Sequence, residues 1–142
     1  MTAGLSATLH ASCVAWHERG LLLAGPSGVG KSDLALRLID AGAVLVADDL
    51  VAVSRDARGL TARPVALAGL IELRGQGIYR VEHRAEAGLA LYVRLGTEGE
   101  RLPEMGTTFT LLDVALPMID LDPRSPSAVA RVRLAVGGVR VH

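Results

Sequence analysis

The sequence is poor in aromatic residues, in cysteine and in unbalanced charge. Aromatic residues make up only 3% of its 142 residues, and Cys13 is its single cysteine. One cysteine cannot form an internal disulfide, which argues against a disulfide-stabilised secreted domain and favours a reducing compartment. We interpret Cys13 as a small buried hydrophobe. Fifteen basic and fifteen acidic residues cancel to a formal charge of zero, so charge gives no support for a nucleic-acid or anionic-membrane partner.

The sequence also lacks long apolar runs. No run approaches the roughly 20 residues that a membrane-spanning helix needs. The N-terminus has no basic segment followed by a continuous apolar block, as a signal peptide would have. We therefore expect a cytoplasmic protein without a membrane partner. Half of the residues are apolar, which suffices for one domain whose core consists mainly of Leu, Val, Ala and Ile.

One stretch matches the phosphate-binding pattern G-x-x-x-x-G-K-[ST] at every fixed position. Its residues are Gly25, Pro26, Ser27, Gly28, Val29, Gly30, Lys31 and Ser32. Residues 20–24 before it form a short apolar run that predicts a buried strand. Residues 33–41 after it have apolar positions at helical spacing. Because this strand–loop–helix order is the context that a P-loop requires, we favour a nucleotide-binding site over a glycine-rich turn that happens to contain Lys-Ser.

The chemistry of a P-loop assigns a role to each of its residue types. Glycines allow backbone N–H groups to turn toward an anion, and the start of a helix adds partial positive charge. Lys31 would contact the β- and γ-phosphates of ATP, and the Ser32 hydroxyl would hold Mg²⁺. The motif therefore predicts ATP and Mg²⁺ as cofactors.

Three acidic residues and one histidine elsewhere in the sequence are further candidates for the same site. Asp48 and Asp49 end the apolar run 43–47, as expected of a pair that serves a metal and a reacting hydroxyl. Adjacent carboxylates also separate each other's pKa values, which would favour different roles. The alternative is a solvated turn. His10 and Glu72 are weaker candidates, because a single histidine or a partly buried carboxylate is often structural.

The remaining pattern predicts an α/β fold with a mixed sheet. We expect a hairpin between residues 9–16 and the strand before the P-loop, since only a short turn joins them. The run 43–47 is interpreted as a central strand, and residues 60–66 pair back onto 50–54. Residues 67–78 predict a strand or a short helix that opens into a glycine loop. Further strands are expected at 89–95, 107–112 and 115–121, and a closing helix at 127–136.

Taken in order, these motifs resemble the catalytic domain of HPr kinase/phosphorylase, a protein serine kinase of the bacterial phosphotransferase system. The resemblance extends over about residues 9–134. The runs 45–49 (LVADD) and 72–78 (ELRGQGI) carry it, because the P-loop alone occurs in many NTPases. It implies a fold related to phosphoenolpyruvate carboxykinase. It also implies a single catalytic domain over residues 1–142, without the N-terminal regulatory domain of many members, as in the short alphaproteobacterial form.

The resemblance also implies roles for residues. Ser32 and Glu72 would hold the metal, and His10 would lie by the phosphates. One of Asp48 and Asp49 would take the proton from the acceptor serine. We favour Asp49, although the sequence does not separate the pair. Arg101 matches a late active-site arginine of the family.

The implied partner is an HPr-type phosphocarrier, and the implied assembly is a homo-oligomer, a hexamer in the family. The late basic loop of the family, associated with dephosphorylation, is replaced here by residues 121–126, which include Asp122. An acid there opposes anion binding, so phosphorylase activity is less well supported than kinase activity. Two alternatives stay open: a P-loop kinase or carboxykinase-like enzyme acting on a small molecule, and a non-catalytic ATP-binding sensor.

Overall fold

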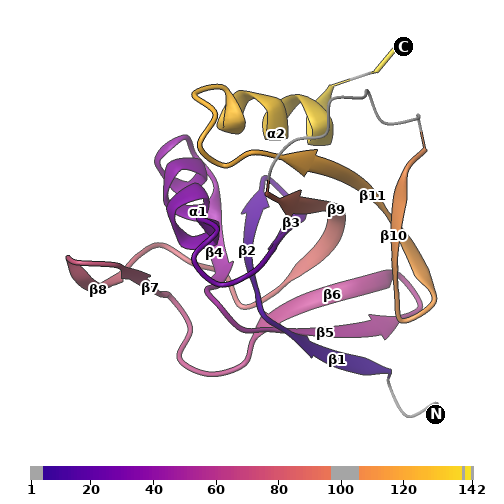
Figure 1. Ribbon diagram of the computed structural model, residues 1–142. Helices are drawn as coiled ribbons and strands as arrows, with labels where there is room; N and C mark the ends of the chain where they lie inside the picture. Colours follow the sequence, from indigo (N-terminus) through magenta and orange to yellow (C-terminus); the bar gives the residue numbers. More distant parts are fainter. Residues whose placement is uncertain (1–4, 97–105, 139, 142) are drawn as a thin grey trace.

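The computed structural model describes residues 5–96, 106–138 and 140–141. Within them, one large mixed sheet carries two helices and a small hairpin (Figure 1). Most of the predicted segments are present, with shifted ends. In chain order the elements are β1 (Ser6–Leu9), β2 (Ala11–Trp16), β3 (Arg19–Ala24), α1 (Lys31–Asp40), β4 (Val44–Ala47), β5 (Val51–Asp56), β6 (Gly59–Pro64), β7 (Leu70–Leu73), β8 (Gly77–Arg80), β9 (Ala87–Leu95), β10 (Thr108–Leu111), β11 (Val114–Leu121) and α2 (Ala128–Gly137).

The sheet is mixed, as predicted. Its strands follow the order β1-β5-β6-β9-β3-β2-β4, and β11 adds to the later part of β9. The β3–β9 and β9–β11 pairs are parallel, and the other pairs of this sheet are antiparallel. The predicted hairpin before the P-loop is confirmed, because β2 pairs antiparallel with β3. So is the pairing of β5 with β6.

Two faces of the central strands are buried in two separate apolar clusters. Along β3, Leu21 and Leu23 face the cluster under the helices, whereas Leu22 faces the opposite cluster. This alternation follows from the two-residue repeat of a strand. All three side chains are fully buried, and burial of each stabilises the fold by about 1.5–3 kcal/mol. The strand that leads into the P-loop is therefore held firmly on both sides.

The two sides of the sheet are covered differently. Helices α1 and α2 lie over one face, and the strands β1, β5 and β6 turn across the other (Figure 1). Val51, Val53 and Leu60 from these strands supply much of the second cluster. Cys13 is fully buried in the same cluster, and this burial raises its pKa to about 12. Its thiol is therefore protonated at neutral pH, in agreement with a structural role.

Two sequence-based expectations need correction. The run 43–47 forms β4, but β4 ends the strand order instead of lying centrally. Its side chains are buried because Leu45 packs into the cluster under the helices and Val46 into the opposite cluster. Its backbone edge is met by residues 82–84, because the amide of Leu45 donates to Glu82 and its carbonyl accepts from Arg84. The predicted strand 9–16 is divided at His10 into β1 and β2, which pair with different strands. Of the two possibilities expected for residues 67–78, the strand is confirmed, because β7 pairs with β8 across a glycine-containing turn.

Candidate functional site

The P-loop follows the C-terminal end of the central strand β3 and leads into α1. Its backbone conformation requires glycine. Gly25, Gly28 and Gly30 have φ values of 155°, 82° and 114°. Residues with a Cβ rarely adopt such positive φ values, whereas glycine does so readily. The amide of Val29 closes the loop on the carbonyl of Pro26 at 3.2 Å. Gly30 caps α1, so the unpaired N–H groups of the first helical turn adjoin the loop. This arrangement suits an anion.

Lys31 is the first residue of α1 and is only 7% exposed. Its Nζ donates hydrogen bonds to the carbonyl oxygens of Gly25 and Pro26, at 2.8 and 3.1 Å. These bonds satisfy the buried ammonium group, which would otherwise be strongly destabilised. The same bonds hold the cation inside the curve of the P-loop, where the phosphates of a nucleotide would lie.

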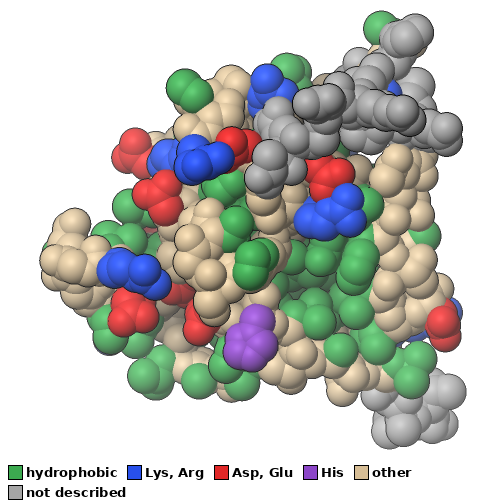
Figure 2. Space-filling view, in the orientation of Figure 1, with side chains coloured by type: hydrophobic (Ala, Val, Ile, Leu, Met, Phe, Trp, Pro, Cys, Tyr) green, Lys and Arg blue, Asp and Glu red, His purple; other side chains and the backbone are tan. Residues whose placement is uncertain are grey.

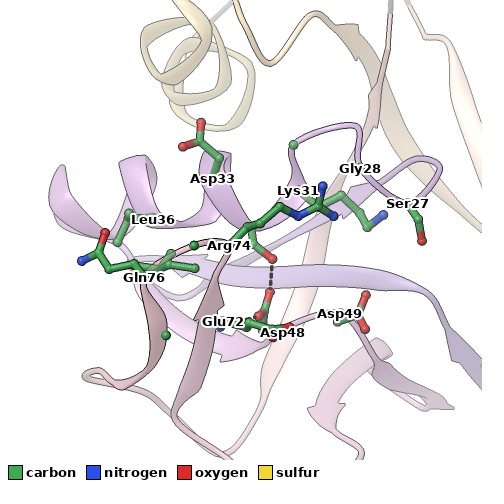
Figure 3. A pocket seen from close by; sticks show the side chains of 15 residues that line it. Ser27, Gly28, Lys31, Asp33, Leu36, Asp48, Asp49, Glu72, Arg74 and Gln76 are labelled. Atoms are coloured by element: carbon green, nitrogen blue, oxygen red, sulfur yellow. Dashed lines mark hydrogen bonds between the residues drawn. The ribbon is translucent and has the colours of Figure 1, made fainter.

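Asp48 follows β4 and joins the P-loop helix to the β7–β8 hairpin. Its Oδ1 accepts a hydrogen bond from the Ser32 hydroxyl at 2.7 Å (Figure 3). The same oxygen accepts a second bond from the Ser12 hydroxyl at 3.0 Å. Its Oδ2 accepts a bond from the backbone amide of Glu72 at 3.1 Å. Three donors therefore fix one carboxylate, and that carboxylate connects β2, α1 and β7.

Asp49 adopts a different orientation from its neighbour. Its φ of 68° places it in the left-handed region, which is uncommon for a residue other than glycine. Its amide donates to the Ser12 hydroxyl at 3.2 Å, and its carbonyl accepts from the amide of Ala11 at 3.1 Å. The Asp49 carboxylate lines the cleft and accepts no hydrogen bond from the part of the chain that the structure describes.

A cleft of about 1000 Å³ lies between the P-loop and the hairpin. Figure 3 shows Lys31 on one side of it and Asp48, Asp49 and Glu72 on the other. In Figure 2, charged side chains gather over the side of the molecule that carries α1 and the β7–β8 hairpin. The cleft is lined by Ser27, Gly28, Gly30, Lys31, Ser32, Asp33, Leu36, Asp48, Asp49, Glu72, Leu73, Arg74, Gly75, Gln76 and Gly77.

Most of the predicted site residues line this cleft, but four do not. Gly25, Pro26 and Val29 belong to the P-loop without lining the cleft. His10 is exposed in the bend between β1 and β2 and is also outside the lining. Arg101, which the resemblance also implied, lies outside the described residues.

Sequence reasoning missed four polar residues of the site: Ser12, Asp33, Arg74 and Gln76. Ser12 lies in a strand whose neighbours are apolar, and its partners are 36 and 37 positions away in the chain. Arg74 belongs to the run 72–78 that carried the resemblance, and its side chain lines the cleft. The location of Arg74 beside a candidate acidic residue was the available signal. No comparable signal existed for Ser12.

The residues present suit a hard divalent cation. The Ser32 hydroxyl and the carboxylates of Asp48, Asp49 and Glu72 offer only oxygen donors on this side of the cleft. Mg²⁺ prefers oxygen, and proteins commonly hold it with one or two carboxylates together with substrate phosphates. No group of three His, Cys, Asp or Glu residues in the described ranges could hold a metal ion without further donors. The donor set therefore fits Mg²⁺ bound together with a nucleotide.

The loop after β11 packs against the P-loop from outside the cleft. A Cβ on Gly30 would lie 3.4 Å from Cγ of Pro123, and the Arg37 guanidinium donates to the Pro123 carbonyl. In this loop Asp122 accepts hydrogen bonds from Arg124 at 2.9–3.3 Å. Those bonds lower the pKa of the Asp122 carboxyl. The negative charge expected from the sequence is thus present and paired with the adjacent arginine.

Comparison with protein families matches residues 3–132 to the model of the HPr serine kinase C-terminal domain. The chain belongs to this family. The HPr kinase/phosphorylase of Treponema pallidum subsp. pallidum is 34% identical over an alignment of 131 residues, and the match covers 82% of this chain and 41% of that protein. That of Limosilactobacillus reuteri is 36% identical over an alignment of 128 residues, and the match covers 80% of this chain and 40% of that protein. The chain thus spans less than half the length of these relatives.

The fold has a close structural counterpart within the family. The Hpr(Ser) kinase/phosphatase from Coxiella burnetii superposes with a TM-score of 0.77 at 25% sequence identity, over 92% of this chain and 93% of that one. A shorter match joins 61 residues to the HPr kinase/phosphorylase of Bordetella pertussis at 51% identity, covering 42% of this chain and 20% of that protein. The α/β fold predicted for this HPr kinase domain is confirmed. In its described residues, no helix is long and apolar enough to cross a membrane.

Proposed function

We propose that this chain is an ATP- and Mg²⁺-dependent protein serine kinase that acts on an HPr-type phosphocarrier. The observation that carries the proposal is one cleft with Lys31 and the P-loop amides on one wall and the acidic residues on the other. Membership of the HPr serine kinase family and the names of the relatives support a carrier serine as the acceptor. The proposal includes a cytoplasmic location and a homo-oligomeric assembly, which in the family is a hexamer.

The reaction is a phosphoryl transfer between two oxygens. The serine hydroxyl oxygen of the carrier forms a bond to the γ-phosphorus of ATP, and the bond from that phosphorus to the β–γ bridging oxygen breaks. ADP leaves, and the hydroxyl proton passes to a carboxylate of the cleft. Lys31 and the N–H groups at the start of α1 stabilise the charge that develops on the transferring group. Mg²⁺, when bound, neutralises charge on the phosphate oxygens, and Ser32 and Glu72 would hold it.

Hydrogen bonding supports Asp49 as the proton acceptor. A general base needs a lone pair that is free to approach the hydroxyl proton. The Asp48 carboxylate already accepts bonds from Ser32, Ser12 and the Glu72 amide. The Asp49 carboxylate lines the cleft without such a bond from the described residues. We therefore assign proton transfer to Asp49, and the orientation of Ser32 to Asp48.

Two further roles stay proposals on weaker support. His10 immediately precedes Ala11, whose amide donates to the Asp49 carbonyl. We propose that it approaches the phosphates when the substrates are bound. Arg101 is proposed as an active-site arginine from the resemblance alone. Reversal by inorganic phosphate is proposed to be weak, because Asp122 pairs with Arg124 and opposes a second anion beside the P-loop.

The direct test uses radiolabelled ATP, Mg²⁺ and a purified HPr-type carrier, with a carrier lacking the acceptor serine as the negative control. We expect label on serine with the wild-type chain. Asp49→Asn should lower kcat by about 10²–10⁴-fold, the usual contribution of a general base, with nucleotide affinity retained. Asp40→Asn is the matched control, since Asp40 is exposed at the end of α1, and should leave kcat unchanged.

Three results would redirect the assignment. No label on the carrier with folded chain and bound nucleotide would contradict the kinase proposal and favour an ATP-binding sensor. Label on a small metabolite instead of the carrier would favour a small-molecule kinase. An unchanged kcat in Asp49→Asn together with a large loss in Asp48→Asn would move the base to Asp48.

A further inference from the structure

Ser12 is a fully buried polar residue in the apolar interior of the sheet. It is the second residue of β2 and pairs in register with Leu23 of β3. A buried hydroxyl destabilises a fold unless it is hydrogen bonded. Both hydrogen bonds of the Ser12 hydroxyl are made with the adjacent residues Asp48 and Asp49, here called the Asp48–Asp49 step. The hydroxyl donates to Asp48 Oδ1 and accepts from the Asp49 amide. Its placement is therefore specific to the acidic wall of the cleft.

The backbone at Asp49 needs such support. A left-handed conformation is unfavourable for a residue with a Cβ, and it persists where surrounding contacts stabilise it. At Asp49 these contacts come from β2: Ser12 accepts from its amide, and Ala11 donates to its carbonyl. The amide of Leu50 also bonds the Asp48 carbonyl at 2.8 Å, which tightens the turn. Strand β2 thus holds both backbone groups of Asp49.

The turn directs two neighbouring carboxylates to different tasks. Asp48 faces the P-loop serine, Ser32, whereas Asp49 is left with a carboxylate free of hydrogen bonds within the described residues. We propose that Ser12 is a positioning residue that sets this division, by holding Asp48 toward Ser32 and the Asp49 backbone in its left-handed conformation. The effect on turnover that we expect rests on the proposed kinase function. The effect of the two Ser12 hydrogen bonds on the conformation of Asp48 and Asp49 does not depend on that function.

The test compares three variants of the full chain. Ser12→Ala removes both hydrogen bonds with a small change in volume. Ser12→Thr keeps a hydroxyl at the same position and serves as the rescue. Thr61→Val is the matched control, because Thr61 is also a buried hydroxyl, on β6, and it bonds Asp56 outside the cleft lining. Thermal unfolding identifies any variant that is not folded under the assay conditions.

Two readouts distinguish positioning from general stability. Hydrogen exchange of the Asp49 amide, followed by nuclear magnetic resonance, should accelerate about tenfold in Ser12→Ala, as loss of one hydrogen bond predicts. It should stay slow in Ser12→Thr and Thr61→Val. On the carrier, kcat of Ser12→Ala should fall by about tenfold while the KM for ATP stays constant, since the P-loop is unchanged. Ser12→Thr should recover most of the lost kcat.

The outcomes separate this inference from the proposed function. Unchanged Asp49 exchange in Ser12→Ala, or an equal kcat loss in Ser12→Ala and Thr61→Val, would overturn the positioning role even if the wild type is an active kinase. An inactive wild type would instead contradict the proposed function. In that case the exchange rates alone would decide whether Ser12 holds the Asp48–Asp49 step.

Discussion

The two walls of the cleft are built on very different supports. The P-loop wall continues from β3, whose three leucines are fully buried, and begins α1 at the buried Lys31. The opposite wall includes the β7–β8 hairpin, in which all four residues of β8 are exposed. Only Ile71 of this hairpin is fully buried. The difference indicates a rigid P-loop wall and a weakly anchored hairpin wall.

One side chain links the two walls. Asp48 bonds the Ser32 hydroxyl on the P-loop side and the Glu72 amide on the hairpin side. An isolated two-stranded hairpin is at best marginally stable in water, so this bond and the burial of Ile71 determine how Glu72 is presented. The comparison therefore predicts that substitutions on the P-loop wall affect turnover strongly, and that substitutions on the hairpin wall have smaller effects.

Of the substitutions on the P-loop and on the hairpin, those on the P-loop are expected to have the largest effect. Lys31→Ala removes the cation that would stabilise the transferring phosphoryl group, and should lower kcat by about 10²–10³-fold. Phosphorylation of the carrier at saturating ATP measures this loss. Arg55→Ala is a suitable control, since Arg55 bonds the Leu112 carbonyl outside the cleft lining. A loss of similar size in both variants would contradict the special role of the P-loop wall.

A smaller effect is expected from the acidic residue on the hairpin. Glu72→Gln should weaken the apparent affinity for Mg²⁺ by about tenfold, because it removes one anionic ligand while keeping the shape of the side chain. The Mg²⁺ dependence of the phosphorylation rate measures this change. Glu86→Gln, which alters an exposed ion pair with Arg63, should leave the dependence as it is. An identical Mg²⁺ dependence in Glu72→Gln and the wild type would remove Glu72 from the metal site.

The smallest effect concerns the anchoring of the hairpin. Ile71→Val should lower the free energy of unfolding by about 0.5–1.5 kcal/mol, the usual range for this change in a core. Ile78→Val should change it by less than about 0.5 kcal/mol, because Ile78 is 66% exposed. Urea denaturation of the two variants gives both values. Equal losses would mean that the exposed side of the hairpin is covered in solution and that the contrast between the walls is weaker.

Local features of the site could be predicted from the sequence. The P-loop, the strand before it and the helix after it depend on neighbouring residues and on a pattern with fixed spacing. The assignment of Asp48 and Asp49 to one site also followed from their place after an apolar run. What the sequence left open was which of the two aspartates would act as the base, since that depends on the hydrogen bonds that Ser12 and Ser32 make to the pair.

Features that depend on distant pairing were harder to predict. An apolar run such as 43–47 is typical of any strand buried on both faces, so its position at the end of the sheet could not be read from composition. It is buried because its side chains pack into the two apolar clusters on the two faces of the sheet. Similarly, a pair of glycines in residues 67–78 indicates a turn, but not that the flanking strands form their own small sheet. Ser12 was overlooked because its partners lie far along the chain.

The P-loop lysine has a practical consequence for following the protein in solution. Lys31 is the only lysine in the sequence, and every other basic residue besides histidine is arginine. Amine acylating reagents modify an ammonium side chain after deprotonation but leave guanidinium groups intact. One acyl tag outside the N-terminal amine therefore reports the state of the P-loop directly. Mass spectrometry of that tag with and without ATP would measure occupancy of the loop without an enzymatic assay.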